Sequence, residues 1–361
     1  MKAVYRCYCF AIPSKLLRKL AEKVDEKDRS AIHDHIKTTS QLRVGRNQLA
    51  RRAVAPLADQ RAELPPYQRT VFDADRSMAL PGQPVRVEGD RPVKDRAANQ
   101  AYDNTGLTLD FFRAVFGRHS IDNRGMPVHS AVHFGENYAN AMWTGEQMVY
   151  GDGDHQVGGF TEAIDIIAHE LSHGVTQHMV PGGLGVARLP LKERAFKEQT
   201  HALKGQSGAL NESFSDVVGS MVKQWHAGHT VKQASWLMGE NMLAPEHGKA
   251  IRSLKDPGNR RLTWYEDDQV KSMDDYVEGA DVHDSSGIPN HAFYLTASRL
   301  GGCSWEKAGP IWYDAWSTLQ SKSTFKDAAK ATAAAAKQRF GAQSPEHLAV
   351  TAAWQAVKVM P

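Results

Sequence analysis

Two histidines four residues apart constrain the fold of this chain more than any other feature of its sequence. They begin and end the segment HELSH, residues 169–173. On an α-helix, residues at this spacing share one face with Cβ atoms about 5–6 Å apart, so both imidazoles can reach one tetrahedral zinc ion. Glu170 lies beside them, where a carboxylate can take a proton from a water that the metal activates. The segment therefore predicts a helix that carries a metal centre.

The residues around this segment favour a helix independently of the two histidines. We expect Thr161 to cap the helix, with Glu162 and Asp165 in its first turn, where carboxylates are favourable. The apolar positions are Ile166, Ile167 and Val175.

A second segment, GALNESFSD at residues 208–216, offers the third ligand that a catalytic zinc needs. Glu212 and Asp216 are four residues apart and share a helical face. We expect Glu212 to bind the metal and Asp216 to accept the far N–H of a ligand imidazole, a supporting role that Asn211 also suits. An isolated HExxH can be a chance feature of a surface helix. Two independent ligand patterns favour a zinc site.

The remaining sequence predicts two lobes after a short N-terminal segment. The 361 residues are too many for one typical core. A helix is expected at 14–25, followed by a polar, basic linker. From 70 to 159, short runs between turn residues predict a β-rich lobe, and after Phe160 helical patterns dominate. The predicted fold class is α+β, with the N-terminal segment at 1–60, the β-rich lobe at 61–177 and the helical lobe at 178–361.

Composition argues against several other classes of protein. The net charge of +3 does not suggest a nucleic-acid-binding protein, and the basic run 43–61 is typical of a solvated linker. No stretch reaches the ~18 apolar residues of a membrane span. Three cysteines argue against a disulfide framework. The N-terminus is a poor signal peptide, so we expect synthesis in the cytoplasm and, where the protein is exported, a route that needs no such leader.

The chain resembles the thermolysin-like zinc peptidases, and among them the protealysin-like branch. The resemblance is carried by HELSH and GALNESFSD and by three further strings: NYANAMW (137–143), IRSLKDP (251–257) and VHDSSGIPNHAFYL (282–295). It implies a two-lobe fold with the active site between the lobes. It also implies an endopeptidase that acts on proteins or peptides and cuts on the amino side of apolar residues.

The same resemblance assigns roles to single residues. His283 would stabilise the tetrahedral intermediate, Arg252 would hold a substrate carbonyl, and Asn140 and Ala141 would bind the substrate backbone as an added strand. Taken alone, His283 would be an ordinary loop residue, Arg252 a surface charge and Asn140 a turn former. The apolar substrate pocket maps to Phe160, Ile166, Met238 and Ile251.

The N-terminal string AIPSKLLRKLAEK resembles the propeptide motif of the protealysin-like branch, with Ser14 in place of a second proline. By this resemblance residues 1–60 would be a propeptide that inhibits the enzyme intramolecularly and is removed by self-cleavage. The alternative is an ordinary helix capped by Ser14. Cys7 or Cys9 is a further candidate to occupy the open zinc position of the precursor.

The sequence also departs from the family pattern near the site. The gap from His173 to Glu212 is about double the usual one, which indicates an insertion at 180–204. The family carries a tyrosine nine residues before the glutamate ligand, and here Leu203, which cannot donate a hydrogen bond, takes its place. His201 could substitute as the oxyanion donor. The carboxylate that orients the catalytic histidine is either Glu278 or Asp281.

A paired calcium site of the family is predicted to be absent. Its matching positions are Asp165, Lys223, Ser235, Leu237 and Glu240, of which two are acidic. Calcium needs six to eight oxygen ligands. We expect the Lys223 ammonium to pair with Asp165 and Glu240 instead.

An alternative function from another class stays open. A zinc-binding homologue that has lost most of its activity could serve as an interaction module. Leu203 favours this alternative, and the intact Glu170 disfavours it.

Overall fold

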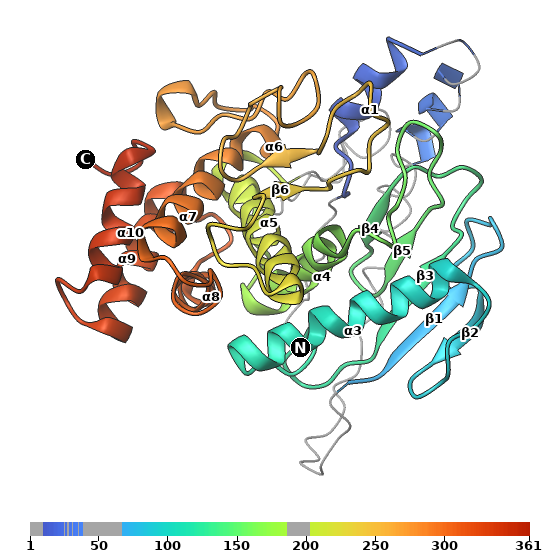
Figure 1. The fold of residues 1–361 in the computed structure, drawn as a ribbon, viewed down its shortest axis with the longest axis horizontal. Coiled ribbons are helices and arrows are strands. Elements are labelled where there is room, and N and C mark those ends of the chain that lie inside the picture. Colours follow the sequence, from blue (N-terminus) through green and yellow to red (C-terminus); the bar gives the residue numbers. More distant parts are fainter. Residues whose placement is uncertain are drawn as a thin grey trace.

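A computed structural model describes residues 10–38 except 25, 27, 28, 31 and 35, together with residues 67–185 and 203–361. The described chain forms a β-rich lobe, a helical lobe and an N-terminal helix (Figure 1). This arrangement confirms the predicted α+β, two-lobe architecture. None of the helices in the described ranges is long and apolar enough to cross a membrane.

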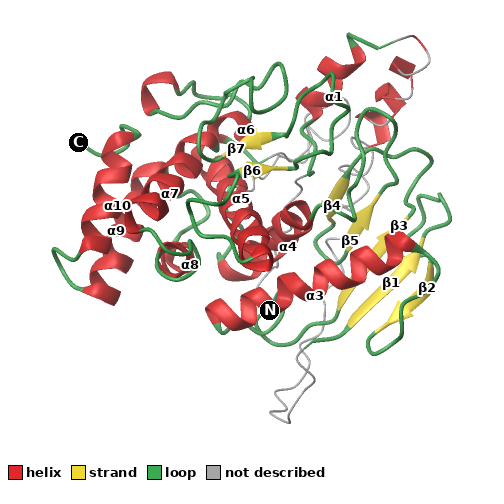
Figure 2. Ribbon diagram, in the orientation of Figure 1, coloured by secondary structure: helices red, strands yellow, loops and turns green. Residues whose placement is uncertain are grey.

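The β-rich lobe is built on a five-stranded sheet of order β2-β1-β3-β5-β4 (Figure 2). Strands β1 and β3 and strands β3 and β5 are parallel, whereas β2 and β4 are antiparallel to their neighbours. All three residues of β4 and of β5 are buried. The strands are β1 (Arg69–Asp73), β2 (Gln83–Val87), β3 (Val128–Val132), β4 (Ala141–Trp143) and β5 (Met148–Tyr150).

A long helix, α3 (Arg96–Phe116), lies along this sheet and was not predicted by the sequence analysis. Asp95 caps its N-terminus by accepting from the Ala98 N–H, and Gly117 ends it in the left-handed conformation. Its buried residues include Ala98, Leu109 and Phe112. The short runs between turn residues at 70–159 favour strands and do not reveal this helix.

The two predicted site helices pack side by side between the lobes. They are α4 (Ile164–Met179) and α5 (Gly205–Ala227). A Cβ atom on Gly219 would lie 2.4 Å from the Asp165 carbonyl oxygen, so glycine permits this close approach. The predicted cap of α4 is wrong: the N-cap is Ala163, because the Thr161 hydroxyl donates to Gln100 Oε1 at 2.8 Å instead.

The helical lobe covers the other side of α5 and supplies the remaining site residues (Figure 2). The short strands β6 (Leu237–Met238) and β7 (Arg252–Ser253) pair beside the site. A core of Trp312, Trp316 and Trp354 holds the C-terminal helices together. The helices are η2 (Met273–Asp275), α6 (Val282–Ser285), α7 (Gly287–Leu300), α8 (Ala308–Thr318), α9 (Phe325–Phe340) and α10 (Pro345–Ala356).

The N-terminal helix α1 (Ser14–Ala21) ends four residues before the predicted boundary. Its apolar face is buried as predicted, with Leu16, Leu17 and Leu20 at most 1% exposed. Pro13 occupies the N-cap position, so Ser14 does not cap the helix.

Candidate active site

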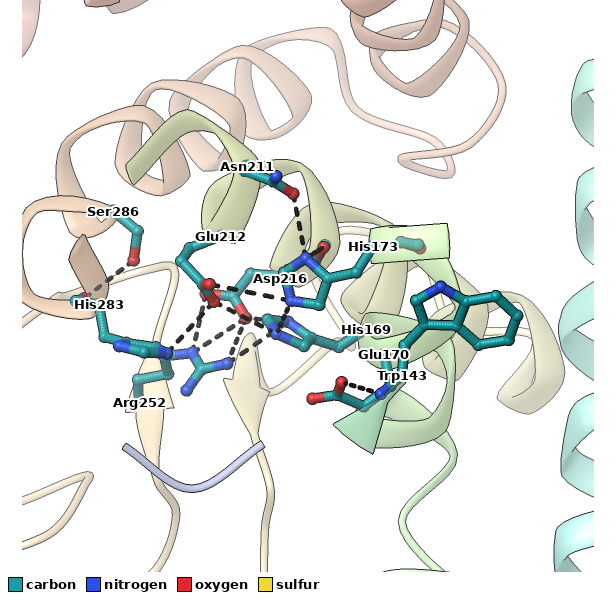
Figure 3. A network of polar contacts seen from close by, with 12 residues as sticks. Trp143, His169, Glu170, His173, Asn211, Glu212, Asp216, Arg252, His283 and Ser286 are labelled. Carbon is teal, nitrogen blue, oxygen red and sulfur yellow. Dashed lines mark hydrogen bonds and ion pairs between the residues drawn. The ribbon is translucent and has the colours of Figure 1, made fainter. Parts of the chain in front are cut away.

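Helices α4 and α5 bring the three predicted ligands to one point (Figure 3). The Nε2 atoms of His169 and His173 are 3.1 Å apart. The Glu212 carboxylate lies 3.4 Å from Nε2 of His169 and 3.8 Å from Nε2 of His173. All three side chains are buried.

Residues of α5 fix the orientation of both imidazoles. Nδ1 of His169 lies 2.8 Å from Asp216 Oδ1, and Nδ1 of His173 lies 3.0 Å from Asn211 Oδ1. The Asn211 amide nitrogen donates to the Leu184 carbonyl, which turns its oxygen towards His173. A proton on each Nδ1 satisfies these contacts and leaves both Nε2 atoms as acceptors facing the shared point.

The donor set fits a zinc ion. Two acceptor nitrogens face each other, and neither Glu212 oxygen has a hydrogen-bond partner among the described residues. Buried acceptors in this arrangement suit a bound cation, because a buried carboxylate without hydrogen-bond donors is costly. Two imidazoles and one carboxylate are the three protein ligands of many catalytic zinc sites.

Glu170 also lies within reach of both imidazoles, but its environment differs from that of Glu212. One of its oxygens accepts the Trp143 N–H of β4 at 2.9 Å, and the other is buried with no hydrogen-bond partner in the described chain. Burial raises the pKa of Glu170 to about 7. For Glu212, three surrounding imidazoles outweigh burial and hold the pKa well below its usual range. The two carboxylates therefore suit different roles, one as a base and one as a ligand.

His283 faces the ligands from α6. Its Nε2 lies 3.4 Å from Glu212, and its Nδ1 lies 2.8 Å from Asp281. Burial disfavours the imidazolium, but Glu212 and Asp281 outweigh this effect and raise the pKa of His283 to about 9. Asp281 is thus the orienting carboxylate of the two candidates, since Glu278 accepts the Tyr276 hydroxyl instead.

Arg252 reaches the site from β7 and is buried. Its Nε and Nη2 atoms both donate to Asp216, at 2.6–2.9 Å. The Asp216 pKa is held low by Arg252 and His169 despite burial. Nη1 of Arg252 has no hydrogen-bond partner among the residues described. This nitrogen is available to a carbonyl oxygen that enters the site.

The N-terminal segment pairs with the residues predicted to bind the substrate backbone. The Ala11 N–H donates to the Ala141 carbonyl at 3.0 Å, and the Ile12 N–H donates to Asn140 Oδ1 at 2.9 Å. The Asn140 amide donates in return to the Ile12 carbonyl at 3.1 Å. The main chain of residues 11–12 therefore lies along the start of β4.

Lysines of α1 and of the turn that follows it continue this contact on the helical lobe. Lys15 lies 2.6 Å from Asp268 and 2.7 Å from Asp284. One turn later Lys19 lies 3.4 Å from Glu266, and Lys23 lies over the Tyr265 ring. These pairs are not predicted from the sequence. The lysine spacing at 15, 19 and 23 was a visible signal, but nothing local indicated its partners about 250 residues away.

Comparison with known proteins agrees with this geometry. A model for the thermolysin metallopeptidase catalytic domain matches residues 62–177, and one for the α-helical domain of the same peptidases matches residues 201–359. The chain belongs to the thermolysin metallopeptidase family. It is a zinc metallopeptidase, and this result bears out the resemblance seen in its sequence.

Individual members of the thermolysin metallopeptidase family are similar over most of the chain. An extracellular metalloprotease of Pectobacterium carotovorum subsp. carotovorum is 40% identical over 351 residues, which are 93% of this chain and 92% of the relative. Protease PrtS of a Photorhabdus species is 41% identical over 75% of this chain and 71% of its own. The precursor of protealysin from Serratia proteamaculans superposes with a TM-score of 0.80 at 37% identity, covering 98% of this chain and 100% of its own.

One departure from the thermolysin-family pattern, Leu203, lies just before the start of α5. Leu203 is buried against Gly208 of α5, next to Val282. His201, the predicted substitute donor, lies outside the described residues, as do Cys7, Cys9, the basic run 43–61 and most of the 180–204 insertion.

The Lys223 side chain lies where the family's paired calcium site maps. Its Nζ lies 3.1 Å from Asp165, 2.6 Å from Glu240 and 3.2 Å from the Leu237 carbonyl oxygen. Ser235 also donates to Glu240. The predicted pairing of Lys223 with both acids is therefore confirmed.

Proposed function

We propose that this chain is the precursor of an endopeptidase in which His169, His173 and Glu212 hold the zinc ion. The observation that carries the proposal is the buried Glu212 carboxylate, whose two oxygens have no hydrogen-bond donor in the described chain while three imidazoles surround them. Asp216 and Asn211 hold the two ligand imidazoles in position.

The side chains around the metal have separate roles in peptide hydrolysis. Bound zinc supplies a Lewis acid that polarises the scissile carbonyl and activates a water. Glu170, with a pKa raised to about 7, takes a proton from the attacking water and passes it to the leaving amine. His283, protonated because Glu212 and Asp281 raise its pKa to about 9, donates to the developing oxyanion. Nη1 of Arg252 donates to a substrate carbonyl.

The hydrogen-bond donors that face the substrate favour an active enzyme over an inactive interaction module. Leu203 removes one donor of the family pattern, and one such donor contributes about 10²–10³ in rate. His283 and Arg252 remain, each held by a buried or half-buried carboxylate. The expected outcome is reduced oxyanion stabilisation rather than loss of the reaction.

We expect the matured protein to hydrolyse casein and to cut before apolar residues. The pocket positions Phe160, Ile166, Met238 and Ile251 are all buried and apolar, so a charged side chain there would lose its hydration. A peptide library should show apolar residues on the carboxyl side of the cut. Removal of zinc by a chelator should abolish cleavage, and added zinc should restore it. A profile dominated there by acidic or basic residues would contradict the pocket assignment.

Residues 1–60 are proposed to be a propeptide that inhibits the enzyme before it is removed. Support comes from the pairing of Ala11 and Ile12 with Ala141 and Asn140, because a substrate strand would use the same groups. The likeness to a protealysin precursor agrees with it. We also propose that the protein acts outside the cell, as the name of the Pectobacterium relative suggests.

We further propose that Lys223 replaces calcium, so millimolar calcium should change the melting temperature of zinc-loaded protein by less than about 1 °C. Asp165 is buried, and its charge is offset by Lys223. Lys223→Met should therefore destabilise the fold by about 2 kcal/mol, as expected for breaking a largely buried pair. Lys326→Met, an exposed lysine of α9, is the control. A calcium-dependent rise of many degrees that disappears in Asp165→Asn would show that a calcium site survives.

A further inference from the structure

The carboxylates of Asp268 and Asp284 form one acidic pair beside the catalytic residues. Asp284 follows His283 directly in α6, and Asp268 lies in the loop before η2. The two carboxylates hold the same ammonium group, that of Lys15, at 2.7 and 2.6 Å. Lys15 is 27% exposed and Asp284 20%, so this ion pair is largely withdrawn from solvent.

Asp284 of this pair lines a small cavity beside the catalytic residues, and Asp268 adjoins it through Lys15. Lys15 lines the same cavity together with Ile251, Arg252 and His283. Ile251 is a predicted residue of the pocket for the first side chain after the cut, and Arg252 presents its unpaired Nη1 nearby. The acidic pair is therefore on the side of the cleft that holds the carboxyl-terminal part of a substrate.

Removal of the N-terminal segment would leave this pair without its ammonium group. Asp268 keeps a second ion pair with Arg260 at 2.6 Å. For the Asp284 carboxylate, Lys15 is the one ion-pair partner found in the described part of the chain. Of the other charged groups that line the cavity, Asp267 and Asp281 are acids, and the cations Arg252 and His283 already pair with Asp216 and with Asp281. A largely buried carboxylate with no ion-pair partner of its own gains most from a cation supplied by the ligand.

We propose that Asp268 and Asp284 form a cation subsite, so that the mature enzyme prefers lysine or arginine at the second or third residue after the cut. The proposal rests on the proposed peptidase function. In the precursor, Lys15 fills this subsite as the basic side chain of a substrate would. The apolar preference at the first residue after the cut is a separate property, because it depends on a different pocket.

The test compares matched peptides cleaved by the self-processed protein. Each peptide carries an apolar residue after the cut and either lysine, norleucine or glutamate at the second or the third position. Norleucine keeps the chain length of lysine without its charge. We expect kcat/KM to be about tenfold higher for lysine than for norleucine at one of these positions, and lowest for glutamate. Asp284→Asn and Asp268→Asn should each reduce the lysine-to-norleucine ratio towards one.

Asp275→Asn is the matched control, because Asp275 is an exposed acid of the same region and its loss changes the net charge equally. This variant should keep the full ratio. Equal cleavage of lysine and norleucine peptides at both positions, or an unchanged ratio in Asp284→Asn, would overturn the subsite. If the enzyme cleaves none of the peptides, the norleucine peptides included, the result would instead count against the proposed peptidase function. In that case, the N-terminal segment is removed with an added protease and the affinity of the trimmed protein for the peptides is measured. Equal affinity for the lysine and norleucine peptides would overturn the subsite as well.

Discussion

Glu170→Gln should lower the rate of casein hydrolysis by about 10²–10⁴-fold, the usual contribution of a general base. Glutamine has the shape of glutamate, and its amide oxygen can still accept the Trp143 N–H. It cannot take up a proton from water. The variant should therefore fold and bind one zinc ion per chain, while the proton transfer that begins the reaction is lost.

The same variant tests whether the enzyme removes its own N-terminal segment. Wild-type protein should shorten during incubation, as followed by N-terminal sequencing, whereas Glu170→Gln incubated alone should keep its original N-terminus. Glu162→Gln, an exposed glutamate just before α4, is the control and should behave as wild type. Casein hydrolysis by Glu170→Gln within threefold of wild type would remove Glu170 from the mechanism. Equal maturation of the isolated variant would rule out self-processing.

The clustering of His169, His173 and Glu212 could be predicted from the sequence because helical geometry relates residues four positions apart. A correct helix assignment is enough to predict that His169 and His173 share one face, and that Glu212 and Asp216 share another. The pairing of the two helices followed from the requirement for a third ligand. The supporting contacts of Asp216 with His169 and of Lys223 with Asp165 are consequences of that same pairing.

Features that depend on loops or on long-range contacts were not accessible in this way. Asp281 and Glu278 could not be separated, because the turn that brings Asp281 onto His283 has no periodic pattern. Thr161 carried a capping signal that the structure uses for a contact with Gln100. Contacts between Lys15 and the acids at 268 and 284 join segments about 250 residues apart, where local patterns carry no information.

His173→Ala should reduce the zinc content of dialysed protein from about one per chain to less than about one tenth, because a catalytic site holds its metal with three protein ligands. Removal of one imidazole also leaves Glu212 and His169 buried with fewer partners. Zinc should therefore stabilise the wild-type fold far more than that of the variant. At a thousandfold excess over the dissociation constant, binding contributes about 4 kcal/mol.

His178→Ala is the matched control, since His178 lies on the exposed side of the same helix. It should keep its zinc and its zinc-dependent rise in melting temperature. Glu212→Gln separates the two carboxylates of the site: loss of zinc in this variant, together with retention in Glu170→Gln, would identify Glu212 as the ligand and Glu170 as the base. The opposite pattern would exchange the two roles. Unchanged zinc content in His173→Ala would show that the metal does not depend on His173, and would overturn the assignment of His169, His173 and Glu212 as its three ligands.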